Sequence, residues 1–326
     1  MITMSDKAKP DEESSTPIHS PQQNRSNTRA IAESILATKR IRKQDMSSVT
    51  VYMLCAVVYL PFGILLLVLR TIVLLLFVLL GALFFPRQIN RKIAIHIVFP
   101  ILGFRSVIHG LDELQQVQQS FFILSLNHVS YIDSAMVCSL LEQSRGTDHF
   151  VRLTSTLVGG TFQWVLLRRL GLIGETICTR SVNFTPGELA QTRQALRSLA
   201  KAPENQARAL LLFPEGQVHN CDKGLLRYKK FCFGLNSAVL PVACSLKVPW
   251  PVNLWVLGDI PGVSFALHLF LPWVRWEYQV LPLCFPKPEE SEQEFASRIQ
   301  QITAQNLGIL ASDLSVRDVI QLENSH

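Results

Sequence analysis

Apolar residues in this chain form one long run, followed by a series of short runs separated by polar residues. The long run covers residues 51–85 and is interrupted only by Pro61, Gly63, Arg70 and Gly81. A straight helix of this length would measure about 52 Å, whereas a hydrocarbon core is about 30 Å thick. We therefore predict a membrane hairpin that bends near Pro61 and Gly63 and leaves by the leaflet it entered.

Basic residues flank the long run on both sides. They are Lys39, Arg40, Arg42 and Lys43 before it, and Arg87, Arg91 and Lys92 after it. Because positive charge concentrates on the cytosolic side of membrane segments, both ends are predicted to be cytosolic. Arg70 would cost about 2.5–3.5 kcal/mol at the centre of a straight span. The alternative is one tilted span over residues 64–84 or 51–69.

Strand patterns and helix patterns alternate in the remainder of the chain. Strands are predicted from short apolar or alternating runs at residues 104–109, 121–126, 207–213, 237–244 and 274–283. Helices are predicted at residues 91–102, 133–141, 162–170, 186–201 and 289–307. Residues 264–273 fit either a core helix or a segment docked at the membrane interface. This alternation predicts an α/β domain with a mixed or mostly parallel sheet and flanking helices.

Four regions follow from these patterns. Residues 1–46 are rich in Ser, Pro, Gln and charged groups, so they are predicted to form a disordered polar tail. Residues 47–86 hold the membrane hairpin and residues 87–287 the α/β domain. Residues 288–326 are predicted to form an amphipathic helix with a short tail.

Composition supports a membrane protein of a reducing compartment. The 326 residues are 48% hydrophobic with a mean hydropathy of +0.24, which is too apolar for a purely soluble domain. The net charge of +6 is scattered, without interleaved aromatics, so it fits an anionic membrane surface better than nucleic acid. The seven cysteines form no C-x-x-C pair, and no histidines show metal-ligand spacing. Neither a disulfide framework nor a metal site is therefore predicted.

One candidate for acid–base chemistry follows the predicted strand at residues 121–126. His128 lies in the loop after this strand, and Asp133 follows five residues later. A carboxylate can keep one imidazole nitrogen protonated while the other takes a proton from a hydroxyl. The alternative is a chance pairing, since this spacing occurs in many chains.

Two further candidates also follow predicted strands. Residues 207–213 lead into Pro214-Glu215-Gly216, which places a carboxylate where α/β sheets usually bind ligands. Arg180 ends another run, where its planar guanidinium could hold a phosphate. Alternatively, Glu215 is a turn residue and Arg180 is solvated.

Together these pieces resemble the motifs of the glycerolipid acyltransferase family over about residues 87–285. Four blocks carry the resemblance in the same order: Asn127-His128-x-x-x-x-Asp133, residues 174–180, Phe213-Pro214-Glu215-Gly216 and residues 239–242. Within that group, residues 59–70 and 223–228 are similar to the ancient ubiquitous protein family of lipid droplets and endoplasmic reticulum.

The resemblance implies acyl transfer from acyl-CoA, as co-substrate, to a lysophospholipid hydroxyl, with no bound cofactor. His128 would be the general base and Asp133 would fix its tautomer, while Asn127 and nearby amides would contact the developing oxyanion. The residues implied to shape the acceptor site are Arg180, Phe213, Pro214, Glu215 and Gly216. The basic residues Lys223, Arg227, Lys229 and Lys230 would either face lipid or CoA phosphates or form a solvated strip.

Two residue stretches depart from the motifs, and the altered second motif together with the hairpin resemblance favours a second function. Ile177-Cys178-Thr179 replaces the usual aromatic and acidic residues, and Gln217-Val218 replaces Thr-Arg, so the acceptor site is expected to be altered. The resemblance also implies a non-catalytic adaptor linked to ER-associated degradation and ubiquitin-pathway proteins. We expect no ubiquitin-binding CUE domain or conjugating-enzyme-binding helix before His326. In either case the predicted location is the endoplasmic reticulum membrane and lipid droplets.

Overall fold

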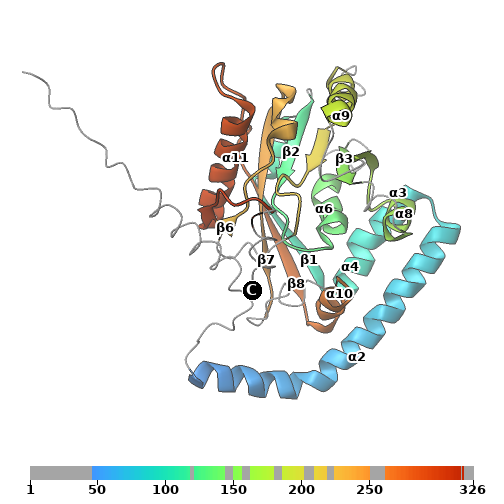
Figure 1. The fold of residues 1–326 in the computed structure, drawn as a ribbon. Helices are drawn as coiled ribbons and strands as arrows, with labels where there is room; N and C mark the ends of the chain where they lie inside the picture. Colours follow the sequence, from blue (N-terminus) through green and yellow to red (C-terminus); the bar gives the residue numbers. More distant parts are fainter. Residues whose placement is uncertain are drawn as a thin grey trace, which may run out of the picture.

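A long N-terminal helix and an α/β domain make up the described part of the chain (Figure 1). This computed structural model describes residues 46–117, 121–143, 150–155, 162–179, 186–201, 209–218, 224–249, 261–316 and 318. The predicted N-terminal tail up to residue 45 lies outside them.

The domain is built on a seven-stranded sheet with the order β1-β8-β7-β2-β5-β3-β4. Its strands are β1 (Phe104–His109), β2 (Phe122–Leu126), β3 (Phe150–Ser155), β4 (Glu175–Thr179), β5 (Ala209–Leu212), β7 (Ala238–Lys247) and β8 (Val274–Val280). All neighbouring strands are parallel except β7 and β8. The predicted mixed, mostly parallel sheet is therefore confirmed. β6 (Gly224–Leu225) and β9 (Leu310–Ala311) form a separate two-stranded sheet.

Helices cover both faces of the large sheet. They are α3 (Arg87–Ile93), a π-helix (Ala94–Val98), α4 (Phe99–Ile101), α5 (Leu111–Gln116), α6 (Asp133–Glu142), α8 (Phe162–Arg169), α9 (Pro186–Ala200), the 3₁₀ helix η5 (Lys230–Leu235), α10 (Pro261–Phe270) and α11 (Glu292–Leu307). In Figure 1, α6 lies on one side of the sheet and α11 on the other. Apolar side chains of α6 share a core with β2 and β8, and those of α11 share a second core with β2, β5 and β7. Both faces of β2 are thus buried, as its continuous apolar run predicts.

Helix α2 (Met46–Phe84) differs from the predicted hairpin. It is one continuous helix of 39 residues with Pro61 inside it, and Figure 1 shows that it bends without reversing direction. A proline removes one backbone hydrogen bond and kinks a helix, but reversal needs a loop, which this run lacks. Among the described residues, its segment Val57–Phe84 is the one helix long and apolar enough to cross a membrane.

Arg70 attaches the middle of α2 to the domain. Its guanidinium donates hydrogen bonds to four backbone carbonyls, three of which belong to the end of α10 and the residues after it. The acceptors are Ile101 O (3.1 Å), Leu269 O (2.9 Å), Leu271 O and Pro272 O (2.8 Å). Because carbonyls at a helix C-terminus carry partial negative charge, they suit a cation. The charge that a bilayer would penalise is therefore satisfied by protein.

One face of α2 packs on the domain over much of its length. Gly63, Arg70 and Phe77, which follow at intervals of two helical turns, are on this face, and Gly81 extends it. Tyr59 Oη also donates to Phe270 O at 2.7 Å. From Tyr59 to Gly81 the contact spans about 33 Å at 1.5 Å per residue. The remaining surface of α2 is largely exposed and apolar, including Leu65, Leu75 and Leu83 among others.

Candidate functional site

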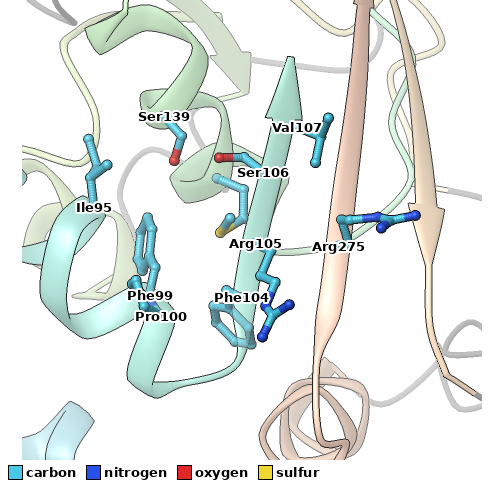
Figure 2. A pocket seen from close by; sticks show the side chains of 10 residues that line it. Ile95, Phe99, Pro100, Phe104, Arg105, Ser106, Val107, Ser139 and Arg275 are labelled. Atoms are coloured by element: carbon cyan, nitrogen blue, oxygen red, sulfur yellow. The ribbon is translucent and has the colours of Figure 1, made fainter. Parts of the chain in front are cut away.

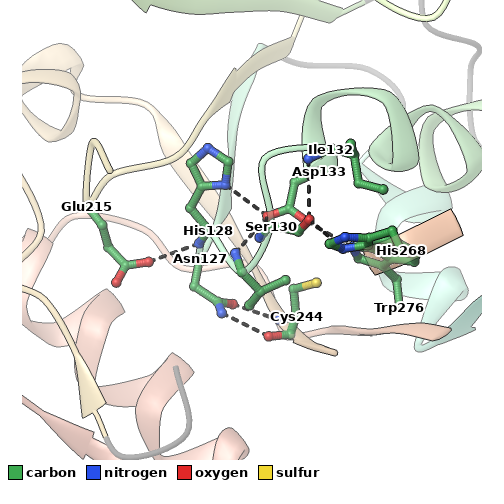
Figure 3. Close-up of polar contacts among 10 residues, drawn as sticks. Asn127, His128, Ser130, Ile132, Asp133, Glu215, Cys244, His268 and Trp276 are labelled. Atoms are coloured by element: carbon green, nitrogen blue, oxygen red, sulfur yellow. Dashed lines mark hydrogen bonds and ion pairs between the residues drawn. The ribbon is translucent and has the colours of Figure 1, made fainter. Parts of the chain in front are cut away.

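His128 and Asp133 face each other in the loop between β2 and α6 (Figure 3). The distance from His128 Nδ1 to Asp133 Oδ2 is 2.8 Å, and the His128 side chain is 16% exposed. The protonated Nδ1 then donates a hydrogen bond to the carboxylate, which leaves Nε2 as the basic nitrogen. The structure thus brings together the two residues that sequence spacing paired.

Asp133 is held by three further hydrogen bonds. Its Oδ2 accepts from the backbone N–H groups of Val129 (2.7 Å) and Ser130 (2.8 Å), and its Oδ1 accepts from Trp276 Nε1 (2.8 Å). The residue also begins α6, where the helix dipole favours negative charge. Trp276 comes from β8, far along the chain, and nothing in the sequence marks it as a partner of Asp133.

Glu215 braces the histidine loop from behind. It is 0% exposed, and its Oε1 accepts the backbone N–H of His128 at 3.0 Å while its Oε2 accepts that of Leu226 at 3.1 Å. Both carboxylate oxygens are therefore engaged by the fold. The predicted clustering of this glutamate with His128 is observed, but its observed contacts are with backbone groups that position the loop.

The neighbours of Glu215 shape the same corner. The Phe213 ring stacks on the imidazole of His128, with centroids 4.2 Å apart and an interplanar angle of 22°. Pro214 O accepts the backbone N–H of Lys229. Gly216 has a φ of 76°, in the left-handed region that favours glycine. Of this motif, Phe213 contacts the imidazole of His128, whereas Glu215 contacts its backbone N–H.

The side chain of Asn127 is occupied by the sheet. It is 0% exposed, its Nδ2 donates to Cys244 O at 2.8 Å, and its Oδ1 accepts from Cys244 N at 2.7 Å. This amide therefore fixes the end of β2 to β7. The predicted contact of Asn127 with an oxyanion stays a prediction. Arg180 and Lys223 lie outside the described residues.

Arg152 is a buried cation near the site that sequence reasoning missed. It is 4% exposed, and its Cζ lies 5.6 Å from the Trp164 ring and 6.0 Å from the Phe213 ring. Burial lowers the pKa of Arg152 to about 10, although Cys138 and Asp133 act to raise it. Its Nε and Nη1 have no hydrogen-bond partner within the described part of the chain. In the sequence, Arg152 stands among the apolar residues of β3, and this charge could have marked it as a candidate site residue.

His268 connects the loop to α10. Ser130 Oγ lies 3.1 Å from His268 Nε2, and His268 Nδ1 lies 2.7 Å from Ser264 O. Burial lowers the pKa of His268, so the neutral ring donates from Nδ1 and accepts from Ser130. Of the two alternatives for residues 264–273, the structure shows the core helix, since His268 and Leu269 are buried.

This arrangement can remove a proton from a hydroxyl beside His128. It supplies a base, a carboxylate that orients it, and a nearby positive charge on Arg152. Within the described residues, no group of three or more His, Cys, Asp or Glu side chains could hold a metal ion.

Comparison with known proteins identifies relatives that are similar in sequence to most of the chain. No family model matches the chain. Over 303 residues it is 24% identical to the lipid droplet-regulating VLDL assembly factor AUP1 of Xenopus laevis, covering 88% of this chain and 64% of that protein. The protein of the same name from Danio rerio is 26% identical over 272 residues, covering 82% and 57%. The Mus musculus protein is 38% identical over 114 residues, covering 33% and 26%.

The chain thus spans less than two thirds of the length of these relatives. Among solved structures, it is similar to the 1-acyl-sn-glycerophosphate (LPA) acyltransferase PlsC from Thermotoga maritima. The TM-score is 0.46 at 18% identity, covering 76% of this chain and 96% of that chain. The sequence matches confirm the predicted resemblance, since the chain is similar to the AUP1 proteins over most of its length.

Proposed function

We propose that this protein is a membrane-held acyltransferase that moves an acyl group from acyl-CoA to a lysophospholipid hydroxyl. The observation that carries the proposal is the 2.8 Å contact between His128 Nδ1 and Asp133 Oδ2, in a loop braced by Glu215. His128 Nε2 takes the hydroxyl proton as the oxygen attacks the thioester carbonyl. The C–S bond then breaks, and the CoA thiolate leaves with that proton.

Arg152 supports this chemistry electrostatically. Its charge is buried near Asp133 without an ion-pair partner among the described residues, so it favours the ionised carboxylate. An ionised Asp133 in turn stabilises the imidazolium that forms when His128 accepts a proton. Arg180 is proposed to hold the acceptor phosphate.

The proposed location is the cytosolic leaflet of the endoplasmic reticulum and the surface of lipid droplets, with both termini in the cytosol. The relatives are named for lipid droplets, and α2 offers a long exposed apolar face. A helix packed sideways on a domain for about 33 Å suits lying along one leaflet better than crossing it. Protease protection tests this topology, because tags at both termini should be digested on sealed microsomes. Protection of either tag would contradict it.

The placement of the site supports a substrate from the membrane. Arg70 of α2 binds the end of α10, and His268 of α10 contacts the loop that carries His128. The candidate base therefore lies on the side of the domain that faces α2. A lysophospholipid could reach it without leaving the leaflet.

A non-catalytic adaptor linked to ER-associated degradation and ubiquitin-pathway proteins is the second candidate. Two observations favour it: the relatives are named as assembly factors, and Ile177-Cys178-Thr179 departs from the second motif. In that case the braced loop would be a structural remnant, and lipid or protein binding would be the function.

Labelled acyl-CoA and a panel of lysophospholipids distinguish the two functions. The purified full chain in nanodiscs should form labelled phospholipid with at least one acceptor, and His128→Ala should lose roughly 10²–10⁴-fold of that rate. His109→Ala is the matched control, since His109 is exposed at the end of β1. Turnover by folded His128→Ala at the wild-type rate would refute the base assignment. No turnover with any acceptor would favour the adaptor.

A further inference from the structure

Three cations from distant parts of the sequence form one row across the sheet. Arg105 on β1 is in register with Arg275 on β8, and Arg275 is in register with Lys247 on β7. Neighbouring strands lie about 4.8 Å apart, so the row spans about 10 Å. Figure 2 shows Arg105 and Arg275 on their adjacent strands.

The row lies on the sheet face opposite the α6 core. Phe104, Val274 and Trp276, which alternate with these cations, are buried in that core, so the cations point the other way. Arg105 and Lys247 are exposed. Glu277 pairs with Arg275 at 2.6 Å and is the one carboxylate on this part of β8. Three cations against one carboxylate leave the row positive.

The row borders the attachment of α2. Arg105 and Arg275 lie two and three residues beyond Gly103 and Pro272, respectively, which surround the guanidinium of Arg70. At about 3.3 Å per residue, the cations are about 7–10 Å from that contact along the strands. Trp273 lies between, with Arg275 Cζ 5.8 Å from its ring. Apolar helix, tryptophan and cations therefore follow in the order that a membrane interface favours.

A cavity of about 410 Å³ adjoins the same two arginines (Figure 2). The rest of its lining is mainly apolar, including Ile95, Phe99 and Phe104. The side chains of Ile95, Phe99 and Phe104 lie on the face of β1 that carries the α6 core, whereas the cations point to the other face. The charged groups therefore lie outside this cavity, and a lipid is favoured over a free phosphate because the row adjoins Trp273 and the apolar helix α2.

We propose that Arg105, Arg275 and Lys247 form a binding surface for the headgroup phosphates of anionic lipids in the leaflet that holds α2. The surface gives the protein a preference for anionic membrane regions and fixes the tilt of the domain over the bilayer. This inference rests on the proposed membrane placement of α2 and is independent of acyl transfer.

Binding of soluble short-chain lipids to the full chain in detergent tests the proposal. Wild type should bind dihexanoyl phosphatidylserine more tightly than dihexanoyl phosphatidylcholine. Arg105→Gln should weaken phosphatidylserine binding roughly fivefold, and R105Q/K247Q roughly 25-fold, at low ionic strength. Arg105→Lys keeps the charge and should retain most of the affinity.

The matched control removes two cations from the opposite end of the sheet, with Arg197→Gln and Lys287→Gln. Unchanged phosphatidylserine binding in this control supports the proposal. Equal loss in the control, or wild-type affinity in a folded R105Q/K247Q, would overturn it. Full competition by inorganic phosphate at equal concentration would overturn the lipid assignment and indicate a simple anion site. Because no acyl transfer is measured, a failure here leaves the proposed reaction untouched.

Discussion

The hydroxyl of Ser130 donates a hydrogen bond to Nε2 of His268, 3.1 Å away, and so joins the loop of the candidate base to α10. The end of α10 also binds Arg70 of the membrane helix. One helix therefore contacts both the membrane anchor and the loop. The position of His128 is thereby tied to the way α2 sits on the domain.

Ser130→Ala should weaken this connection. It removes the donor to His268 and the acceptor for the Ile132 N–H, which lies 3.3 Å from Ser130 Oγ. We expect kcat for acyl transfer to fall roughly 5–10-fold, because each neutral hydrogen bond contributes about 0.5–1.5 kcal/mol. Steady-state kinetics should show KM for acyl-CoA nearly unchanged. Ser237→Ala, at the other end of the sheet, is the control, and a similar loss there would argue against a local effect.

Trp276→Phe should remove one hydrogen bond to Asp133 while keeping an aromatic ring in the core. The indole N–H donates to Oδ1 of Asp133, and a hydrogen bond to a charged group contributes about 1.5–3 kcal/mol. We expect a loss in kcat of about 10–100-fold, measured with the best acceptor. Trp273→Phe should keep activity, since its ring faces Arg275 and not the pair. Full activity in Trp276→Phe would show that Asp133 needs no third anchor.

Glu215→Gln should destabilise the loop by about 1–3 kcal/mol. The two carboxylate oxygens accept the N–H groups of His128 and Leu226, and a glutamine amide replaces one acceptor with a donor that opposes an N–H. Hydrogen exchange should show faster opening of the amides of His128 and Leu226. Exchange of these amides at the wild-type rate would show that the hydrogen bonds of Glu215 do not control how often the loop opens.

Arg70→Met should lower the stability of the domain as well as that of its anchor. The guanidinium satisfies four carbonyls, and each charged hydrogen bond contributes about 1.5–3 kcal/mol. We expect a loss of at least about 3 kcal/mol and a Tm lower by about 6–12 °C in detergent. Arg70→Lys should lose less stability than Arg70→Met, because the ammonium group keeps the positive charge and some of the hydrogen bonds. An unchanged Tm in Arg70→Met would mean that α2 is not attached through this residue.

His268 predicts a stability change in mild acid. Burial lowers its pKa in the folded protein, while the unfolded value is about 6.5. As pH falls below about 6.5, the unfolded chain binds a proton that the folded chain does not, so the free energy of unfolding decreases. Well above pH 6.5 neither state binds this proton, so His268 no longer makes the free energy of unfolding depend on pH. Denaturant unfolding from pH 5 to 8 should show a slope that is reduced in His268→Gln, and an identical slope would contradict the assignment.

Patterns in the sequence predicted those parts of the fold that depend on residues close together in the chain. The continuous apolar runs predicted β2 and β5, and the spacing of His128 and Asp133 predicted a pair that the structure places 2.8 Å apart. Both depend on residues close in sequence, or on burial from both sides. The bend in α2 was also expected from Pro61, although the reversal was wrong.

The remaining features depend on contacts between distant segments. Trp276, Arg152 and the carbonyl partners of Arg70 become neighbours of the site or the anchor only when the strand order and the packing of α10 are fixed. β3 was missed because Arg152 and Thr154 interrupt its apolar pattern. The cationic row requires the register of three strands, which no local pattern encodes.

Arg70 binds carbonyl groups that are synthesised much later than Arg70 itself. Leu269, one of its acceptors, is made 199 residues later, which corresponds to about 10–40 s of translation at 5–20 residues per second. Throughout this interval the guanidinium must be hydrated or held by lipid phosphates at the bilayer surface. The apolar helix can therefore reach its final depth only after residues 269–272 have emerged from the ribosome and folded against it.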